Sequence, residues 1–339
     1  MAIAGYKHAI QGGAGLKNGN DWANAYGEAE LETFLEGAPV GYVVFIMDGT
    51  YTLDSDIVCV NATAVNPTAL IGVKSGTVNE GANVLYSDWA RDAADRPLFN
   101  CGAAWDFTGG QYYDIRNIDF TGSVGGTLVQ MGSYSITENC KATQSTAVAN
   151  RIALQGQTEA ALINCEATNP AGNGINCGLS GRAFFCYAHD CGNIGFQMGN
   201  NGVFYAFNIA DNCVDGFNVG SRDYCVFLNN TVYDCDIGFS GTDGDSTISI
   251  NNLLENCSAD GFKWTTQLDS NFFWNNWGDD VRNNDMWDLV DETTVFQDYP
   301  NNTVPLTGDP LFVNPGVDHS LQDDSGCLGT GDGITLGVG

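Results

Sequence analysis

The sequence predicts an all-β chain that coils into a single-stranded, right-handed parallel β-helix, a solenoid with about 22 residues per coil and an N-terminal capping helix. Three observations support this fold class: a repeat of constant period, a high glycine content, and a short helical pattern ahead of the repeats. Glycine accounts for 43 of the 339 residues, almost twice its usual share. Hydrophobic residues make up 43% of the chain and charged residues 16%, which suits many tight turns around an apolar core.

The N-terminal segment, residues 1–40, is expected to hold the capping helix. Residues 20–36 begin with Asn20 and Asp21, which are favourable N-cap residues. The large side chains of this segment recur at helical spacing, at Trp22, Tyr26, Ala29 and Phe34. The sequence therefore predicts an amphipathic helix that covers the open end of the solenoid, where unpaired strand edges would otherwise template aggregation.

Coiling is expected to begin with the apolar run 41–47, which is typical of a buried strand and is followed by the turn residues Asp48 and Gly49. The coils are predicted to occupy residues 41–264, and an aromatic-rich loop with the closing coils is predicted for residues 265–339.

A repeat without gaps occupies the centre of the chain. Each copy alternates apolar and polar residues for a few positions, then has a cysteine, and then a glycine followed by a phenylalanine. The cysteines advance by 22 residues at Cys191, Cys213, Cys235 and Cys257, and less regular earlier copies hold Cys140 and Cys165. Because successive coils of a β-helix stack about 4.8 Å apart, equivalent residues are expected to form ladders along its axis.

These ladders lead to specific structural predictions. The four cysteines are expected to form an interior column of free thiols, because side chains that point in parallel are poorly placed for the disulfide torsion. A core column is predicted for Phe196, Phe217, Phe239 and Phe262, each preceded by a glycine that would permit a tight corner. A corner ladder of stacked amides is predicted for Asn208, Asn230 and Asn252. The position before each cysteine alternates between Asp and Asn, which avoids stacking like charges, at Asp190, Asn212, Asp234 and Asn256.

The charge of the chain argues against two classes of partner. The formal net charge is −29, from 41 acidic and 12 basic residues. A field of this sign repels phosphate backbones and anionic lipids, so nucleic acid and membrane insertion are not expected. The N-terminus shows neither a signal peptide pattern nor a stretch of about 18 apolar residues that would span a membrane.

Both ends of the chain resemble a known group of proteins. The string DWANAY at 21–26 and the string DGTYTL at 48–53 look like the opening of pectin-lyase-like right-handed β-helix proteins. The strings GDPLFVNP at 308–315, HSLQ at 319–322 and SGCLGTG at 325–331 resemble the closing coils of the same group. The resemblance implies the fold but not an activity, because the group includes lyases, hydrolases, adhesins and phage surface proteins.

The residues for catalysis that the resemblance implies do not stand out in the sequence. Lyases of the group use Ca²⁺-binding carboxylates near a Lys or Arg base, and hydrolases use paired Asp residues with an adjacent Gly-His-Gly; neither pattern is found here. The basic residues Arg182, Arg222 and Lys263 share no repeat position, and the three histidines are expected to be structural or exposed. No catalytic residue is therefore predicted.

Two candidate ligand sites remain. The oxygen-rich turn with Asp243 and Asp245 offers ligands that Ca²⁺ prefers, although a plain turn is the alternative. The aromatic-dense stretch with Trp274, Trp277 and Trp287 offers a glycan or partner surface, or else packs beneath a loop.

The function favoured at this point is a non-enzymatic structural protein of a virion surface, either a capsid decoration or a tail spike or fibre module, with attachment to a host-surface glycan. Such a protein is made in the reducing host cytoplasm, keeps its thiols and assembles with other virion proteins or with itself, for example as a homotrimer. The alternatives are a polysaccharide lyase or glycoside hydrolase, and thirdly a secreted adhesin located outside the cell. No cofactor other than Ca²⁺ is expected.

Overall fold

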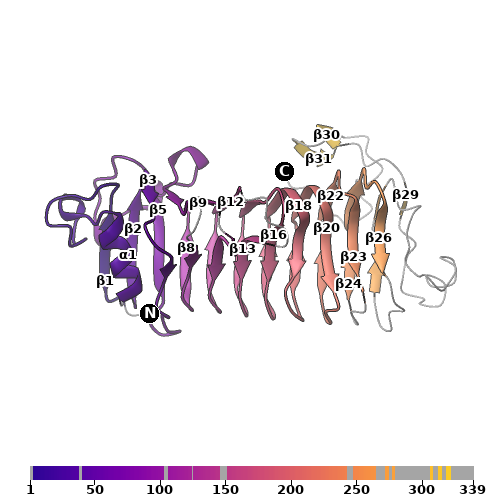
Figure 1. Ribbon diagram of the computed structural model, residues 1–339, viewed down its shortest axis with the longest axis horizontal. Helices are drawn as coiled ribbons and strands as arrows, with labels where there is room; N and C mark the ends of the chain where they lie inside the picture. Colours follow the sequence, from indigo (N-terminus) through magenta and orange to yellow (C-terminus); the bar gives the residue numbers. More distant parts are fainter. Residues whose placement is uncertain are drawn as a thin grey trace. The chain divides into compact units, whose positions relative to one another are not determined.

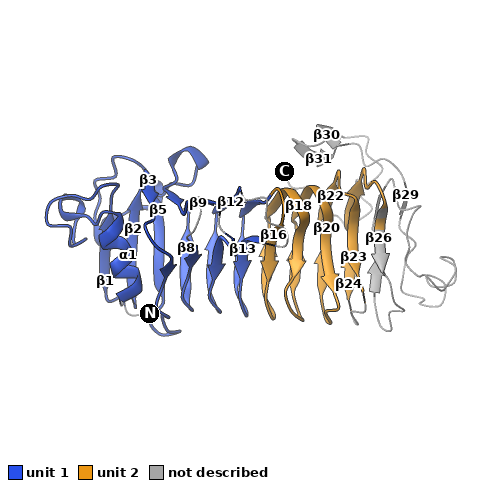
Figure 2. Cartoon of the chain, in the orientation of Figure 1, with its two compact units in different colours: residues 1–169 blue, residues 170–339 orange. Residues whose placement is uncertain are grey.

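The computed structural model describes residues 3–37, 40–102, 106–123, 125–145, 151–242 and 247–264, together with the strand segments 272–274, 277–278, 306–307, 312–314 and 318–321. The chain divides into two compact units, residues 1–169 and residues 170–339 (Figure 2). In each unit short parallel strands stack coil upon coil (Figure 1). The predicted fold class, an all-β parallel β-helix with a helix near the N-terminus, is thereby confirmed. No helix in the described part of the chain is long and apolar enough to cross a membrane.

The first unit contains two walls of parallel strands and one α-helix, α1 (Glu28–Gly37). Its first sheet consists of β1 (Gly5–Ala9), β2 (Tyr42–Met47), β5 (Thr68–Val73), β8 (Tyr113–Arg116), β11 (Ile136–Glu138) and β14 (Ala161–Ile163). Its second sheet contains β3 (Thr50–Thr52), β4 (Ile57–Val58), β6 (Leu98–Asn100), β7 (Phe107–Thr108), β9 (Asp119–Gly122), β10 (Val129–Met131), β12 (Lys141–Gln144), β13 (Ile152–Gly156) and β15 (Glu166–Thr168). Short 3₁₀ turns are η1 (Trp22–Asn24), η2 (Gly81–Asn83), η3 (Tyr86–Asp88) and η4 (Ala93–Asp95).

The second unit repeats the same plan. Its first sheet consists of β17 (Arg182–Phe184), β19 (Phe204–Ala206), β21 (Val226–Leu228), β24 (Ile248–Ile250) and β27 (Phe272–Trp274). Its second sheet contains β16 (Asn173–Cys177), β18 (Tyr187–Met198), β20 (Ile209–Gly220), β22 (Thr231–Tyr233), β23 (Ile237–Gly241), β25 (Leu253–Glu255), β26 (Asp260–Trp264), β28 (Trp277–Gly278) and β29 (Leu306–Thr307). An antiparallel pair is formed by β30 (Phe312–Asn314) and β31 (Asp318–Leu321). The register pairs Phe204 with Val226 and Val226 with Ile248, so one coil is 22 residues long here.

The N-terminal helix is shorter than the sequence pattern predicts. The expected helix over 20–36 begins only at Glu28, because Tyr26 pairs in extended conformation with β1: its amide donates to the His8 carbonyl at 2.9 Å. The buried apolar side chains of α1 are Leu31 and Leu35 rather than the aromatic residues. The start of the helix is therefore set by the backbone pairing of Tyr26 with β1 and not by the helical spacing of the aromatic residues.

The core of the second unit contains the predicted columns. Phe196, Phe217 and Phe239 are fully buried, and their rings stack in parallel with centroid separations of 4.7 and 4.9 Å. Phe262 pairs with Phe239 through the backbone of β26, and its side chain lies outside the described residues. The four cysteines of the 22-residue series are free and no more than 5% exposed, at Cys191, Cys213, Cys235 and Cys257.

The glycine before each core phenylalanine has a different role from the predicted one. The backbones of Gly195, Gly216 and Gly238 do not have positive φ, so these residues do not provide a conformation reserved for glycine. Instead, a Cβ on Gly216 would lie 2.7 Å from the Gly238 carbonyl oxygen, and one on Gly238 would lie 2.3 Å from a methyl group of Leu254. These positions therefore admit no side chain, because the next coil already fills the space.

Asn and Asp residues form the corners of the coils. Asp190, Asn212, Asp234 and Asn256 all have φ between 50° and 58°, a left-handed conformation that Asn and Asp adopt more readily than other side chains. Within each Asp–Asn pair an amide donates to a carboxylate, from Asn212 to Asp190 at 2.7 Å and from Asn256 to Asp234 at 2.6 Å. The predicted amide ladder is also present, since the Asn208 amide donates to Asn230 Oδ1 at 3.1 Å and that of Asn230 to Asn252 Oδ1 at 3.0 Å.

Candidate functional site

A long loop, residues 74–97, covers part of the outer face of the first sheet in the first unit. The loop follows β5, and Trp89 in it forms an antiparallel bridge with Val73. Apolar packing holds it, because Trp89 and Val84 lie against a cluster that includes Phe45 and Ile71. Asp88 fixes the loop internally by accepting hydrogen bonds at 2.8 Å from the Leu85 amide and from Asn79 Nδ2. The backbone of the loop is thus held in place by apolar packing and by hydrogen bonds within the loop.

A column of asparagines borders this loop. Asn117, Asn139 and Asn164 occupy one corner of three successive coils with φ of 57°, 55° and 50°. Their amides form a chain, from Asn164 Nδ2 to Asn139 Oδ1 at 3.1 Å and from Asn139 Nδ2 to Asn117 Oδ1 at 2.7 Å. Asn117 ends the chain, so its Nδ2 is buried without a hydrogen-bond partner, and the residue is only 3% exposed. A buried donor without an acceptor is costly, so the end of the ladder at Asn117 carries a desolvation penalty that the inner amides of the ladder avoid.

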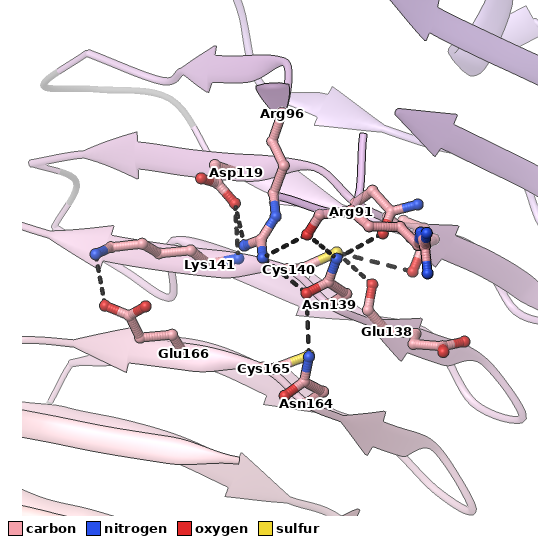
Figure 3. Close-up of polar contacts among 12 residues, drawn as sticks. Arg91, Arg96, Asp119, Glu138, Asn139, Cys140, Lys141, Asn164, Cys165 and Glu166 are labelled. Carbon is pink, nitrogen blue, oxygen red and sulfur yellow. Dashed lines mark hydrogen bonds and ion pairs between the residues drawn. The ribbon is translucent and has the colours of Figure 1, made fainter. Parts of the chain in front are cut away.

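Arg96 joins the loop to the asparagine column (Figure 3). Its guanidinium contacts Asp119 Oδ1 at 3.1 Å and donates to Asn139 Oδ1 at 2.7 Å and to the Arg91 carbonyl at 3.3 Å. Burial raises the pKa of Asp119, and Arg96 opposes this shift. Since the Arg96 side chain is only 11% exposed, it serves as an internal brace.

Arg91 is positioned by its own backbone. Its carbonyl accepts hydrogen bonds from Asn139 Nδ2 at 2.8 Å and from Arg96 (Figure 3). Its guanidinium lies 4.6 Å from the ring centroid of Tyr86 and has no carboxylate partner among the described residues. Arg91 therefore presents an uncompensated positive charge beside an aromatic ring.

Arg116 is held differently. It makes a bidentate pair with Asp114, at 2.7 and 2.9 Å, and a further ion pair with Glu138 at 2.7 Å. The hydrogen bonds to Asp114 are the main reason that the pKa of Arg116 is raised, so this side chain remains protonated. It also lies 5.7 Å from the Trp89 ring centroid. Nearby, Lys141 Nζ pairs with Glu166 Oε1 at 2.5 Å (Figure 3).

Together these residues enclose a cavity of about 250 Å³. It is lined by Tyr86, Trp89, Arg91, Arg116, Asn117, Glu138, Asn139 and Asn164. Among these groups the two aromatic rings can contact the apolar face of a sugar, the Arg91 guanidinium can pair with a carboxylate and the amides can bind hydroxyl oxygens, while Arg116 and Glu138 already pair with each other.

The side chains of the predicted ligand residues lie outside the described part of the chain. Trp274 and Trp277 lie in β27 and β28, and their side chains are outside the described residues. Trp287, Asp243 and Asp245 also lie outside the described residues. Of the basic residues considered earlier, Arg182 and Arg222 are in the second unit, on β17 and in the connection before β21.

The side chains of His8 and His189 are held by contacts within the fold, and that of His319, in β31, lies outside the described residues. His8 is 1% exposed and accepts a hydrogen bond from the Gly81 amide at 3.2 Å. His189 stacks on Tyr187 with centroids 4.4 Å apart and pairs with Asp190 at 2.8 Å.

Sequence reasoning missed the cavity because it searched for positions repeated at 22 residues. Arg91 and Arg96 lie in an insertion that has no repeat, and Arg116 and Lys141 occupy different strand positions in two coils. A signal was present: four of the 12 basic residues of a strongly acidic chain lie between positions 91 and 141, just after an aromatic pair.

A second hollow, of about 490 Å³, lies in the second unit. It is lined by acidic and small residues, including Asp190, Asn212, Asp234, Asp236 and Ser258. The three carboxylates already accept hydrogen bonds, for example from Ser258 Oγ to Asp236 at 2.7 Å. No cluster of three or more metal-ligating side chains is found in the described part of the chain.

Comparisons with known proteins agree with the fold. Residues 147–285 match the family model described as the right handed beta helix region. A rhamnogalacturonan lyase is similar in structure over 90% of this chain and 85% of its own, with a TM-score of 0.59 at 11% identity. The pectate lyase Pel9A is similar over 99% of this chain and 96% of its own, with a TM-score of 0.55 at 14% identity. An alginate lyase from Paenibacillus sp. str. FPU-7 is similar over 78% and 94%, with a TM-score of 0.56 at 11% identity. No curated protein matches the sequence.

Proposed function

Because the chain has the right-handed parallel β-helix fold of the pectin-lyase-like proteins, we propose that it binds an acidic polysaccharide, one that carries uronate carboxylates, in the cavity between the 74–97 loop and the asparagine column. The observation that carries the proposal is Arg91, whose backbone is fixed by two hydrogen bonds and whose guanidinium faces no carboxylate among the described residues. A sugar carboxylate would supply the missing partner.

The surroundings of Arg91 favour a carboxylate over a neutral group. The chain carries a formal charge of −29, with 41 acidic residues against 12 basic ones, so an arginine without a carboxylate partner is unusual in it. Charge-assisted hydrogen bonds from arginine to a carboxylate are roughly twice as strong as neutral ones.

The direct test is binding of oligogalacturonate and oligomannuronate by calorimetry, with neutral oligosaccharides of equal length as the comparison. We expect the uronates to bind and Arg91→Gln to weaken binding by about 10-fold to 100-fold, the range for a hydrogen bond to a charged group. Arg222→Gln, which removes the same charge in the second unit, is the matched control and should leave binding unchanged. Equal binding of neutral and acidic sugars, or full binding by Arg91→Gln, would overturn the proposal.

Cleavage of the bound glycan is the second candidate function, because the similar structures are described as pectate, alginate and rhamnogalacturonan lyases. The local chemistry favours binding without cleavage: Arg116 is saturated by two carboxylates and its pKa is raised, so it is a poor base. The assay is the ultraviolet absorbance of unsaturated products over time. Turnover that Arg116→Lys or Arg91→Gln abolishes would establish the lyase in place of the binding protein.

For the biological setting we propose attachment to a glycan-coated surface, either as a capsid decoration or tail spike module of a virion or as a secreted adhesin. Binding of a surface glycan by a β-helix serves any of these roles. Co-purification of the chain with assembled capsids or tails, from cells that produce them, distinguishes the virion role from the adhesin.

A further inference from the structure

The outer face of the first sheet in the second unit is apolar. Along β17, β19, β21 and β24 the inward residues are Ala183, Tyr205, Phe227 and Ser249, and all four are buried. The alternate residues point outward, and all of them are partly or fully exposed except Ala206, which is buried. The apolar ones are Phe184, Phe204, Val226, Leu228, Ile248 and Ile250. Because the register is constant from strand to strand, these side chains form regular rows.

This face differs in charge from the rest of the chain. The whole sequence has 41 acidic residues, yet the four strands carry none. Their single charged residue is Arg182, which is exposed at the edge of the first row. A flat set of apolar side chains without carboxylates is unusual on an acidic surface and is typical of an interaction site.

Two aromatic side chains at the border of the face also indicate an interaction site. Phe185 and Phe207 have φ of 56° and 59°, in the left-handed region where the equivalent residues of the next coils are Asn229 and Asn251. Bulky residues are uncommon in this conformation. The two rings stack with centroids 5.2 Å apart, and Phe185 is 49% exposed. The chain therefore retains exposed aromatic rings where asparagine would relieve the backbone, which indicates a use for them outside the fold.

We propose that this face is a self-association surface and that its occupant is a second copy of the chain. Two copies that each carry a formal charge of −29 repel one another where their carboxylates approach. The four strands carry no carboxylate, so a contact made through them avoids this local repulsion. At about 0.15 M ionic strength charges more than ~8 Å away are largely screened, so the local composition decides the contact. Arg182 of each copy adds one positive charge that is attracted by the net negative charge of the other copy.

The experiment is sedimentation velocity of the full chain from micromolar to submillimolar concentration. We expect concentration-dependent association that strengthens with added salt. Val226→Glu should raise the dissociation constant by about 10-fold or more, because it would bury an unpaired carboxylate in the contact, and Leu228→Lys should do the same with the opposite charge. Ile136→Glu is the control, since Ile136 is a partly exposed residue of β11 in the first unit, 37% accessible, and should not alter association.

Far-ultraviolet circular dichroism and the thermal midpoint establish that each variant is folded. A second measurement does not depend on weakening the contact: Val226→Cys introduces a partly exposed thiol into a chain whose described cysteines are all buried, and a short bis-maleimide should then join two copies. A wild type that remains monomeric throughout, association that survives both charge variants, or a Val226→Cys chain that never cross-links would each overturn the proposal. Glycan binding at Arg91 is measured separately and does not affect this outcome.

Discussion

At the scale of single residues, the repeated asparagines and the repeated glycines of this chain are explained by different physical requirements. The corner asparagines and aspartates are selected for a backbone conformation, as the positive φ of Asn212 and Asp234 shows. The glycines before the core phenylalanines are selected for volume, since a Cβ on Gly216 would meet the carbonyl oxygen of Gly238. The 22-residue period of the sequence identified both the corner residues and the glycines before the phenylalanines. It did not show why glycine recurs there, because a tight corner and a close approach of the next coil would both produce a repeated glycine.

This distinction leads to a prediction for Gly216→Ala. The added Cβ would lie 2.7 Å from a backbone oxygen and 2.9 Å from a Val232 methyl group, so the coils must shift. We expect a loss of about 1–3 kcal/mol in the free energy of unfolding, measured by urea denaturation. Gly37→Ala is the control, because nothing lies within 4 Å of its Cβ position. Equal stability of the two variants would mean that Gly216 is not limited by space.

A second prediction concerns His8, which is neutral in the folded chain. Its Nε2 accepts from the Gly81 amide at 3.2 Å, so the proton is on Nδ1, which faces the Gly19 carbonyl at 3.3 Å. Burial lowers the pKa of His8 below 6.5, although Glu80 and Asp21 oppose the shift and Lys7 adds to it. The unfolded chain therefore binds the proton more strongly than the folded chain does. The contribution of His8 to stability is complete above pH 6.5 and is lost as the pH falls from there through the lowered pKa.

The measurement is the free energy of unfolding of wild type and His8→Gln across this pH range. Because buried carboxyl groups such as Asp119 also titrate on the acidic side, only the difference between the two proteins reports on His8. We expect wild type to lose stability relative to His8→Gln as the pH falls below 6.5. Parallel curves would show that His8 is not the titrating group.

At the scale of elements, the regular strands of the second unit could be predicted from the sequence and the 74–97 loop could not. The predicted phenylalanine column exists because each coil places the same residue at the same height, as with Phe217 paired to Phe239. The loop has no copy elsewhere in the chain, and its position depends on one packed tryptophan, Trp89, and on Arg96, which reaches the Asn139 corner. Contacts between residues distant in sequence and without a period do not appear as a repeat, and the basic residues gathered between positions 91 and 141 fit no repeat position. The candidate site, which the loop completes, was therefore missed.

The phenylalanine column gives a prediction at this scale. Phe217 is fully buried and stacks on a ring above and a ring below, so Phe217→Ala leaves a cavity that neighbouring coils fill poorly. We expect a loss of about 3–5 kcal/mol in the free energy of unfolding. Val214→Ala is the control, since Val214 is 40% exposed on the same strand. A loss below about 1 kcal/mol for Phe217→Ala would be inconsistent with a packed column.

At the scale of the whole molecule, the negative charge was readable from composition, but its distribution was not. The formal charge of −29 predicts only what the chain as a whole repels. The structure shows two places that depart from this negative charge. These are the arginines around the 250 Å³ cavity of the first unit and the four strands without carboxylates in the second unit. Both arise because residues separated by one or more coils in sequence become neighbours in space.

The cysteines provide the last prediction, which concerns the chain as a whole. The 11 cysteines in the described part are free and buried, from Cys59 in the first unit to Cys257 in the second. Burial raises the pKa of the Cys59 and Cys101 thiols to about 12 and that of Cys225 to about 11, so these groups are poor nucleophiles in the folded state. We expect a thiol reagent to label the 11 described cysteines of the native protein slowly and to label nearly all 12 cysteines of the unfolded, non-reduced protein at once. The rate of native labelling should rise with the destabilisation caused by Phe217→Ala and should be unchanged in Val214→Ala, because labelling requires the coils to open. Protein that titrates mostly as disulfide after unfolding, or native thiols that react as fast as a free cysteine, would contradict the buried thiol columns.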